Sequence, residues 1–273
     1  MGTFGYRDGI AVLQIIVFPV VFVTSLFIWR RVGWRVGGKS WRFVATFSLL
    51  RIAGSICTFL RISNDSEKIF IAEAVCELIG IAPLLLTYIG ILGQIPTTNV
   101  YLLSDSHQSI NPRHLRLVTL LGFLGLILGI VGVSIMDTNT TFHANSEMKA
   151  AMGIFLAVFT IMTFLTGWLV LQLWFTLCAW QKKLFRAIVL SWPFLLVRLV
   201  YSAMGDYGSD ARFVIGGSNT IYLCMDVLEE IFAMALCVGF GLSAMREKER
   251  EEVAVSDTWT TVGPKIGQFN VES

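Results

Sequence analysis

Charged residues are scarce in this sequence. Only 15% of its 273 residues are Asp, Glu, Lys or Arg, and the mean hydropathy is +0.70. Water-soluble domains contain about 25% charged residues, so this scarcity excludes an ordinary soluble globular protein. The net charge is only +2, and no basic run alternates with aromatic residues, so no nucleic-acid partner is expected.

Paired cysteines and a cleavable leader are also missing. All five cysteines lie in apolar stretches and none belongs to a C-x-x-C motif, which predicts neither a disulfide nor a zinc site. We therefore expect no metal and no cofactor. The opening residues MGTFGYRDG contain neither a basic segment nor a small-residue cleavage site, so the first apolar run is predicted to be a retained helix.

Long apolar runs dominate instead. About 20 apolar residues cross the hydrocarbon core of a bilayer. Seven runs reach that length: Ile10–Trp29, Phe43–Leu60, Ile69–Leu92, Leu117–Met136, Ala150–Trp180, Ala187–Met204 and Phe213–Met245. They predict an all-α, polytopic bundle of seven transmembrane helices over residues 1–245, in an endomembrane or the plasma membrane. Residues 246–273 are predicted to form a polar, largely disordered tail.

The basic residues between these runs predict the orientation. Fourteen Lys and Arg residues fall on one side of the seven runs, and five, among them Arg7 and Arg61, fall on the other. Cytosolic loops carry the excess of basic residues, so the N-terminus is predicted outside and the C-terminus in the cytosol. The sequon at Asn139 then lies outside, which makes Asn139 the predicted glycosylation site.

Several apolar runs nevertheless contain charged residues. An ionised side chain at mid-membrane costs about 2.5–3.5 kcal/mol, so these residues should face other helices and not lipid. We predict that they meet in a polar centre in the outer half of the bundle. The predicted ligand-binding or polar-core set is Arg51, Glu73, Glu77, Arg198, Asp226, Glu229 and Glu230.

This set has more acids than bases. Two arginines face five carboxylates, which leaves three carboxylates in surplus. A buried group without a partner becomes neutral, so at least one carboxylate of the last run is predicted to be protonated at neutral pH. Two interpretations stay open: an ion-pair network that only fixes helix register, and a ligand or proton site, which the surplus favours.

Two acidic stretches outside the apolar runs suggest a different chemistry. Asn64-Asp65-Ser66-Glu67 and Asp206–Asp210 resemble the Mg²⁺-diphosphate motifs of membrane prenyltransferases. Both are expected on outer loops, and the first lacks its second Asp. We interpret them as solvated loop charges.

Within the third and fourth runs, proline and glycine indicate where a helix bends and where two helices pack closely. Pro83 is predicted to kink its helix and free a carbonyl for a neighbouring helix. Gly122, Gly125, Gly129 and Gly132 share one helix face, which predicts close backbone packing.

The stretches SLLRIAGSICTF, ELIGIAPLLL and PFLLVRLVYS resemble a family of seven-helix membrane proteins from filamentous fungi, described as a domain of unknown function. The resemblance extends from Tyr6 to about Met245. It implies a fungal integral membrane protein, with some members encoded near secondary-metabolite genes, and it supplies no catalytic residues.

Three functions are compatible with these features. The leading hypothesis is a non-enzymatic protein that binds or senses a small lipophilic molecule beside Arg51, Glu77, Arg198 and Asp226, with membrane lipid as its other partner. The alternative is a membrane enzyme of the terpene cyclase or isomerase type, with Asp226 or Glu230 as general acid. A transporter ranks third, since there is no inverted repeat.

Overall fold

The computed structural model describes residues 5–32, 38–63, 66–99, 112–135, 145–173, 177–208 and 218–266, and the elements in these ranges are all helical. The predicted all-α class is therefore confirmed. The elements are α1 (Tyr6–Val32), α2 (Gly38–Ser63), α3 (Glu67–Ile79), α4 (Ile81–Asn99), α5 (Pro112–Ser134), α6 (Ser146–Leu173), α7 (Ala179–Tyr207), α8 (Asn219–Tyr222), the π-helical turn η1 (Leu223–Val227) and α9 (Leu228–Ile266).

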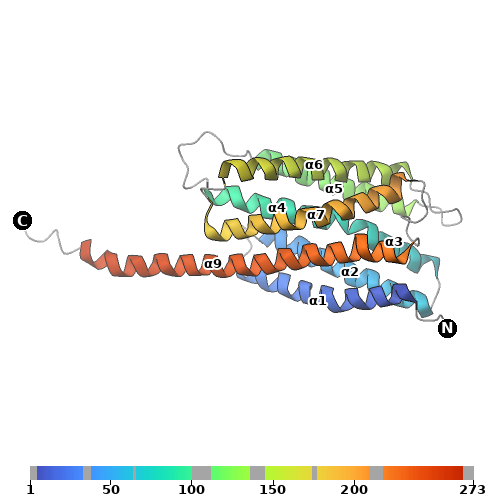
Figure 1. Cartoon of the computed structure of the whole chain (residues 1–273), viewed down its shortest axis with the longest axis horizontal. Helices are drawn as coiled ribbons and strands as arrows, with labels where there is room; N and C mark the ends of the chain where they lie inside the picture. Colours follow the sequence, from blue (N-terminus) through green and yellow to red (C-terminus); the bar gives the residue numbers. More distant parts are fainter. Residues whose placement is uncertain are drawn as a thin grey trace, which may run out of the picture.

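The long helices lie side by side in one bundle (Figure 1). The main neighbouring pairs are α1 with α2, α5 with α6, and α7 with α9. Helix α4 lies at the centre, because Leu84, Tyr88 and Leu92 are all buried. The N-terminal end of α1 lies at one end of the bundle, and α9 projects far beyond the opposite end.

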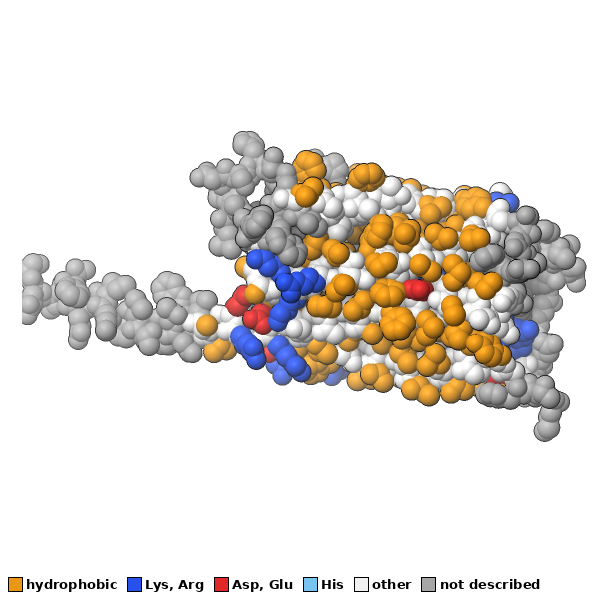
Figure 2. Space-filling model, viewed as in Figure 1, with side chains coloured by type: hydrophobic (Ala, Val, Ile, Leu, Met, Phe, Trp, Pro, Cys, Tyr) orange, Lys and Arg blue, Asp and Glu red, His pale blue; other side chains and the backbone are white. Residues whose placement is uncertain are grey.

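The outer surface of the bundle is apolar. In the part of the chain that the structure describes, six helical segments are long and apolar enough to cross a membrane, and the segment from α8 to α9 is not among these six. Large side chains such as Phe164 and Leu171 are 75% and 82% exposed, and Figure 2 shows apolar side chains over most of the visible bundle face. A soluble monomer rarely exposes so large an apolar patch, whereas lipid tails would cover it at no cost.

Glycines let two of the helices approach closely, as predicted for α5. A Cβ atom placed at Gly125 would lie 2.9 Å from the ring of Phe155, and one at Gly132 would lie 2.7 Å from Met148. Only hydrogen fits at these positions, so the glycine face of α5 packs directly on α6.

Several helices are longer than the apolar runs that predicted them. Helix α1 includes Arg7, α2 includes Arg61, and α7 begins before Lys182 and ends after Asp206. These residues were expected in loops, and that expectation was wrong. Hydropathy locates the hydrocarbon core, whereas a helix ends where its backbone hydrogen bonds end, which adds one or two turns beyond the core.

The third apolar run is not one helix. It divides at Gly80 into α3 and α4, three residues before Pro83. Proline has no N–H to donate to the carbonyl of Ile79, and its ring crowds that carbonyl, so the helix is interrupted one turn before the proline.

The last helix continues past the boundary predicted at residue 245. Helix α9 extends to Ile266, so the expectation of a largely disordered tail is corrected for residues 246–266. Two ion pairs stabilise its base against other helices, Lys183 Nζ to Glu247 Oε2 at 2.8 Å and Arg31 Nη1 to Glu249 Oε1 at 3.2 Å.

Candidate functional site

Four charged side chains meet in the middle of the bundle, and we call them the inner cluster: Arg51, Arg198, Asp226 and Glu230. Arg198 Nε lies 2.9 Å from Glu230 Oε1 and also contacts Asp226. Arg51 contacts Glu230 and lies 3.7 Å from Asp226 Oδ1. All four are at least 97% buried, so the cluster is closed to its surroundings.

A π-helical turn positions the two acids of this cluster. The N–H of Leu228 donates to the carbonyl of Leu223, five residues back, so this turn holds one residue more than an α-helical turn. The wider turn contains Asp226 and leads directly into the turn of Glu230. Such turns are rare inside α-helices and often occur at functional sites.

A second group of charges lies nearer the N-terminal end of α1, and we call it the outer cluster: Arg7, Arg61, Glu73 and Glu77. Arg7 Nη2 is 3.3 Å from Glu73 Oε1 and 3.0 Å from Glu77 Oε1. Arg61 Nη1 donates to Glu73 Oε2 at 3.2 Å. Each carboxylate of the outer cluster therefore has an arginine partner.

The outer cluster changes the predicted charge balance. Arg7 and Arg61 were counted as loop residues, so they were left out of the sum that gave three surplus carboxylates. With both included, only Glu229 of the predicted set has no ion pair in the described part of the chain. Glu229 is half-buried, and one of its oxygens is buried without a hydrogen-bond donor. One oxygen each of Asp226 and Glu230 is also buried without a hydrogen-bond partner, but both of these carboxylates are close to arginines.

One arginine connects the two clusters. Arg198 Nη2 donates to the backbone carbonyl of Glu77 at 3.2 Å, one turn before the break between α3 and α4. The Arg7 guanidinium, which pairs with the Glu77 carboxylate, lies 5.4 Å from the centre of the Tyr222 ring. Polar groups therefore continue from the half-exposed end of Arg61 to the centre of the bundle.

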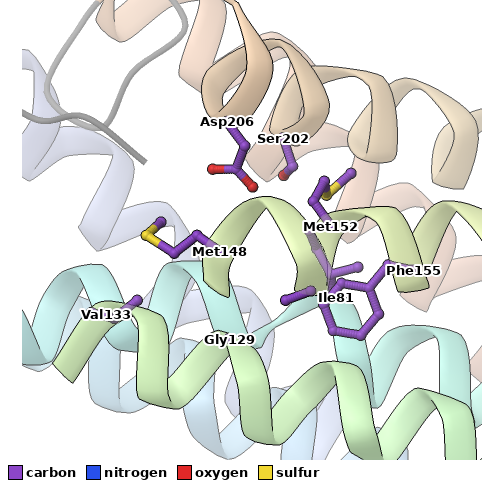
Figure 3. A pocket seen from close by; sticks show the side chains of 9 residues that line it. Ile81, Gly129, Val133, Met148, Met152, Phe155, Ser202 and Asp206 are labelled. Atoms are coloured by element: carbon purple, nitrogen blue, oxygen red, sulfur yellow. The ribbon is translucent and has the colours of Figure 1, made fainter. Parts of the chain in front are cut away.

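A small crevice lies beside this network, between α4, α5, α6 and α7 (Figure 3). Its cavity volume is about 30 Å³. Most of its lining is apolar, and the polar side chains in it are Ser202 and Asp206. The lining residues are Ile81, Gly129, Val133, Met148, Ala151, Met152, Phe155, Ser202 and Asp206.

Like Glu229, Asp206 has no ion-pair partner among the described residues, and unlike Glu229 it borders the crevice. It lies in the last turn of α7, where it is half-buried, and its carboxylate makes no ion pair or hydrogen bond with the described residues. The nearest charges acting on it are those of Arg198 and Lys149. A carboxylate beside a crevice is chemically available, whereas the paired acids of the inner cluster are not.

Sequence reasoning missed Asp206 by assigning it to a solvated loop. The spacing of the residues could have placed it correctly. Arg198, Ser202 and Asp206 follow one another at intervals of four, so they share one face of α7. Ser202 also connects the crevice with the inner cluster, since its hydroxyl accepts a hydrogen bond from Arg198 Nη1.

Some predicted residues fall outside the described part of the chain. These are the sequon at Asn139 and the acidic residues Asp65 and Asp210. Within the described ranges, no three His, Cys, Asp or Glu side chains are grouped so as to hold a metal ion.

Residues 4–248 match the family model described as Domain of unknown function (DUF7702). The chain belongs to the DUF7702 family. The match covers both clusters and the crevice, so these features all lie within the DUF7702 domain, and the domain of unknown function expected from the resemblance is confirmed. No curated protein and no solved structure matches the chain.

Proposed function

We propose that this DUF7702 protein crosses a membrane seven times and binds a small lipophilic molecule at the crevice. Occupancy of the crevice is transmitted to the inner cluster through Ser202 and Arg198. The same molecule was first expected beside Arg51, Glu77, Arg198 and Asp226. Because Arg51 and Arg198 already contact Asp226, and the Glu77 carboxylate pairs with Arg7, we assign the binding site to the neighbouring crevice. A fungal origin and a link with secondary metabolism remain predictions of the resemblance.

Burial of the acids supports a seventh span. Asp226 and Glu230 are 1% and 0% exposed, so two of the three acids that lower the hydropathy of the last helix do not face lipid, and the third, Glu229, is half-buried. The helix can therefore lie at membrane depth with its apolar side outward. Seven spans place the two termini on opposite sides of the membrane.

The distribution of basic residues supports an outside N-terminus. Figure 2 shows Lys and Arg side chains gathered where α9 leaves the bundle. Arg31, Lys183 and Lys248 lie in this region, close to acidic partners or to the Trp180 ring. Because cytosolic ends carry the basic excess, this end faces the cytosol and the crevice lies in the outer half of the bundle.

One observation carries the proposal: Asp206, a carboxylate with no ion pair to any residue in the described part of the chain, borders a crevice whose other polar side chain is hydrogen-bonded to Arg198. A group that enters the crevice changes the surroundings of Ser202, which accepts a hydrogen bond from Arg198. Arg198 also donates to Glu230 on α9 and to the backbone carbonyl of Glu77 on α3. Ser202 alone therefore connects the crevice with the hydrogen-bond network of Arg198, which joins α2, α3, α7 and α9.

The enzymatic alternative has less support. Its candidate general acids, Asp226 and Glu230, are held by two arginines, and neither lines the crevice. A general acid must come within hydrogen-bond distance of its substrate. No specific observation on the described residues favours a transporter.

The test is photolabelling of the full chain in lipid nanodiscs with diazirine-bearing decanol and decylamine. At least one of these two probes should label peptides that contain Met148–Phe155 or Ser202–Asp206, and an excess of the same unlabelled compound should compete. Gly129→Leu should abolish this labelling, because Gly129 borders the crevice and its added side chain fills it.

Gly167→Leu is the matched control. It makes the same change on α6 at an exposed glycine with no atom within 4 Å of a new Cβ, so labelling of the crevice should persist. Labelling that is not competed, or that survives Gly129→Leu, would refute the proposal.

A further inference from the structure

We infer that the group entering the crevice is a small cation, the protonated primary amine of a lipophilic molecule, which pairs with Asp206. This inference rests on the proposed binding function and specifies the chemical class of the ligand. Four features of the crevice support a primary amine. They are its acidic residue, the hydrogen bonds that the neighbouring Arg198 already makes, the chemistry of the lining and the volume of the cavity.

The crevice offers one acidic group and no basic group. Asp206 is the only ionisable group in the lining, and no Lys, Arg or His lines the crevice within the described part of the chain. A carboxylate beside an apolar surface is stabilised by a cation at hydrogen-bond distance more than by a neutral donor. A ligand with its own negative charge is excluded for the same reason.

The protein's neighbouring cations do not fill this place. Arg198 acts on Asp206 at long range, but its three nitrogens already donate to Glu230, Ser202 and the carbonyl of Glu77. Moving Arg198 to Asp206 would break all three bonds. Lys149 is exposed, and no ion pair joins it to Asp206 among the described contacts. Asp206 therefore has room for a cation from outside the chain.

The apolar lining also suits a cation. Met148 and Met152 carry polarisable thioethers, and Phe155 presents an aromatic ring to the same space. Aromatic faces attract ammonium groups through their quadrupole, and methionine adapts its shape to the group beside it. A neutral alkyl group would pack here too, but it would leave Asp206 without a partner.

The size of the cavity selects the kind of amine. A volume of about 30 Å³ compares with roughly 10–15 Å³ for one water molecule. A primary ammonium group with its first methylene fits that space, whereas a trimethylammonium group does not. The rest of the ligand must lie outside the cavity, along the apolar surface of the bundle, which explains why the molecule has to be lipophilic.

The experiment compares three photoreactive decyl probes that differ in the head group: a primary amine, a hydroxyl and a trimethylammonium. In nanodiscs of neutral lipid, half-maximal labelling of the crevice peptides should need about tenfold less amine than alcohol, since a charge-assisted hydrogen bond is lost with the alcohol. Trimethylammonium should label no better than the alcohol.

Asp206→Asn should remove the preference for the amine while labelling by the alcohol persists, because the amide keeps the shape of the carboxylate. Glu147→Gln is the matched control, since it neutralises a nearby acid of α6 that does not line the crevice. Unfolding temperatures equal to wild type would establish that both variants fold.

The outcomes separate the two proposals. Equal labelling by amine and alcohol, with both lost in Gly129→Leu, would overturn the inference and leave the binding function intact. No competed labelling by any probe would refute the binding function itself. An amine preference that appears only after Lys149→Gln would also overturn the inference, because Asp206 would then be satisfied by Lys149.

Discussion

The inner cluster and the crevice both include residues of α7, and they differ in whether their carboxylates are paired with arginines. Asp226 and Glu230 each contact both Arg51 and Arg198, and all four side chains are buried. Asp206, two turns after Arg198, borders a cavity and has no ion-pair partner among the described residues. Paired charges in a closed site fix how helices pack, whereas an unpaired charge at an open site is available to a ligand.

The largest effect should come from breaking the inner cluster. Arg198→Met leaves two buried carboxylates with one arginine, and we expect a loss of about 3–5 kcal/mol in the free energy of unfolding. Asp206→Asn should change it by about 0.5 kcal/mol or less, as at a site without a partner. Denaturant unfolding in mixed micelles measures both variants.

A second substitution sharpens this test. The double variant Arg198→Met with Glu230→Gln should recover part of the lost stability, because it removes one of the two carboxylates and leaves Asp226 with Arg51. Equal losses in Arg198→Met and Asp206→Asn would contradict the distinction between the closed cluster and the open crevice.

An intermediate effect is expected at the break between α3 and α4. A Cβ atom at Gly80 would lie 3.0 Å from Arg51 Nη2, so Gly80→Ala should displace the guanidinium and destabilise the protein by about 1–3 kcal/mol. Gly80 has ordinary helical backbone angles, so the cost comes from the contact and not from the backbone.

Gly167→Ala is the control for this prediction. It has open space around the new methyl group and should be neutral or stabilising by up to about 1 kcal/mol. Thermal unfolding of the two variants side by side checks the difference, and a Gly80→Ala protein as stable as Gly167→Ala would show that Arg51 is not held tightly.

The smallest effect concerns charges outside the apolar band. The hydrogen bond from Lys183 lowers the pKa of the half-buried Glu247 carboxylate below its usual value. A lowered folded-state pKa stabilises the protein above the unfolded pKa, and this contribution disappears as the pH falls through the folded value. Glu247→Gln should therefore lower the unfolding temperature slightly at neutral pH and not at acid pH.

Glu251→Gln serves as its control, because Glu251 makes no ion pair with a described residue. High salt should reduce the effect of Glu247→Gln, since exposed pairs are screened. A difference that persists unchanged at pH values well below the usual carboxyl range would contradict the assignment to Glu247.

The sequence indicated much of the inner cluster but not its neighbours. Arg51, Arg198, Asp226 and Glu230 stand out because a charge inside an apolar run is costly unless it faces another helix. Arg7 and Asp206 lie at the edges of such runs, where loop and helix look alike in composition. Their roles depend on one further turn of helix, which hydropathy does not report.

What the sequence determined by itself is the helical class, the apolar surface and the need to bury the charges of the apolar runs. These follow from composition and period, because a backbone in lipid must satisfy its own hydrogen bonds and a charge there must find a partner. Only the tertiary structure decided which partner each charge took. Pairing depends on how far each helix is rotated and extended, and the π-turn before Glu230, the break at Gly80 and the last turn of α7 each alter that rotation or extent.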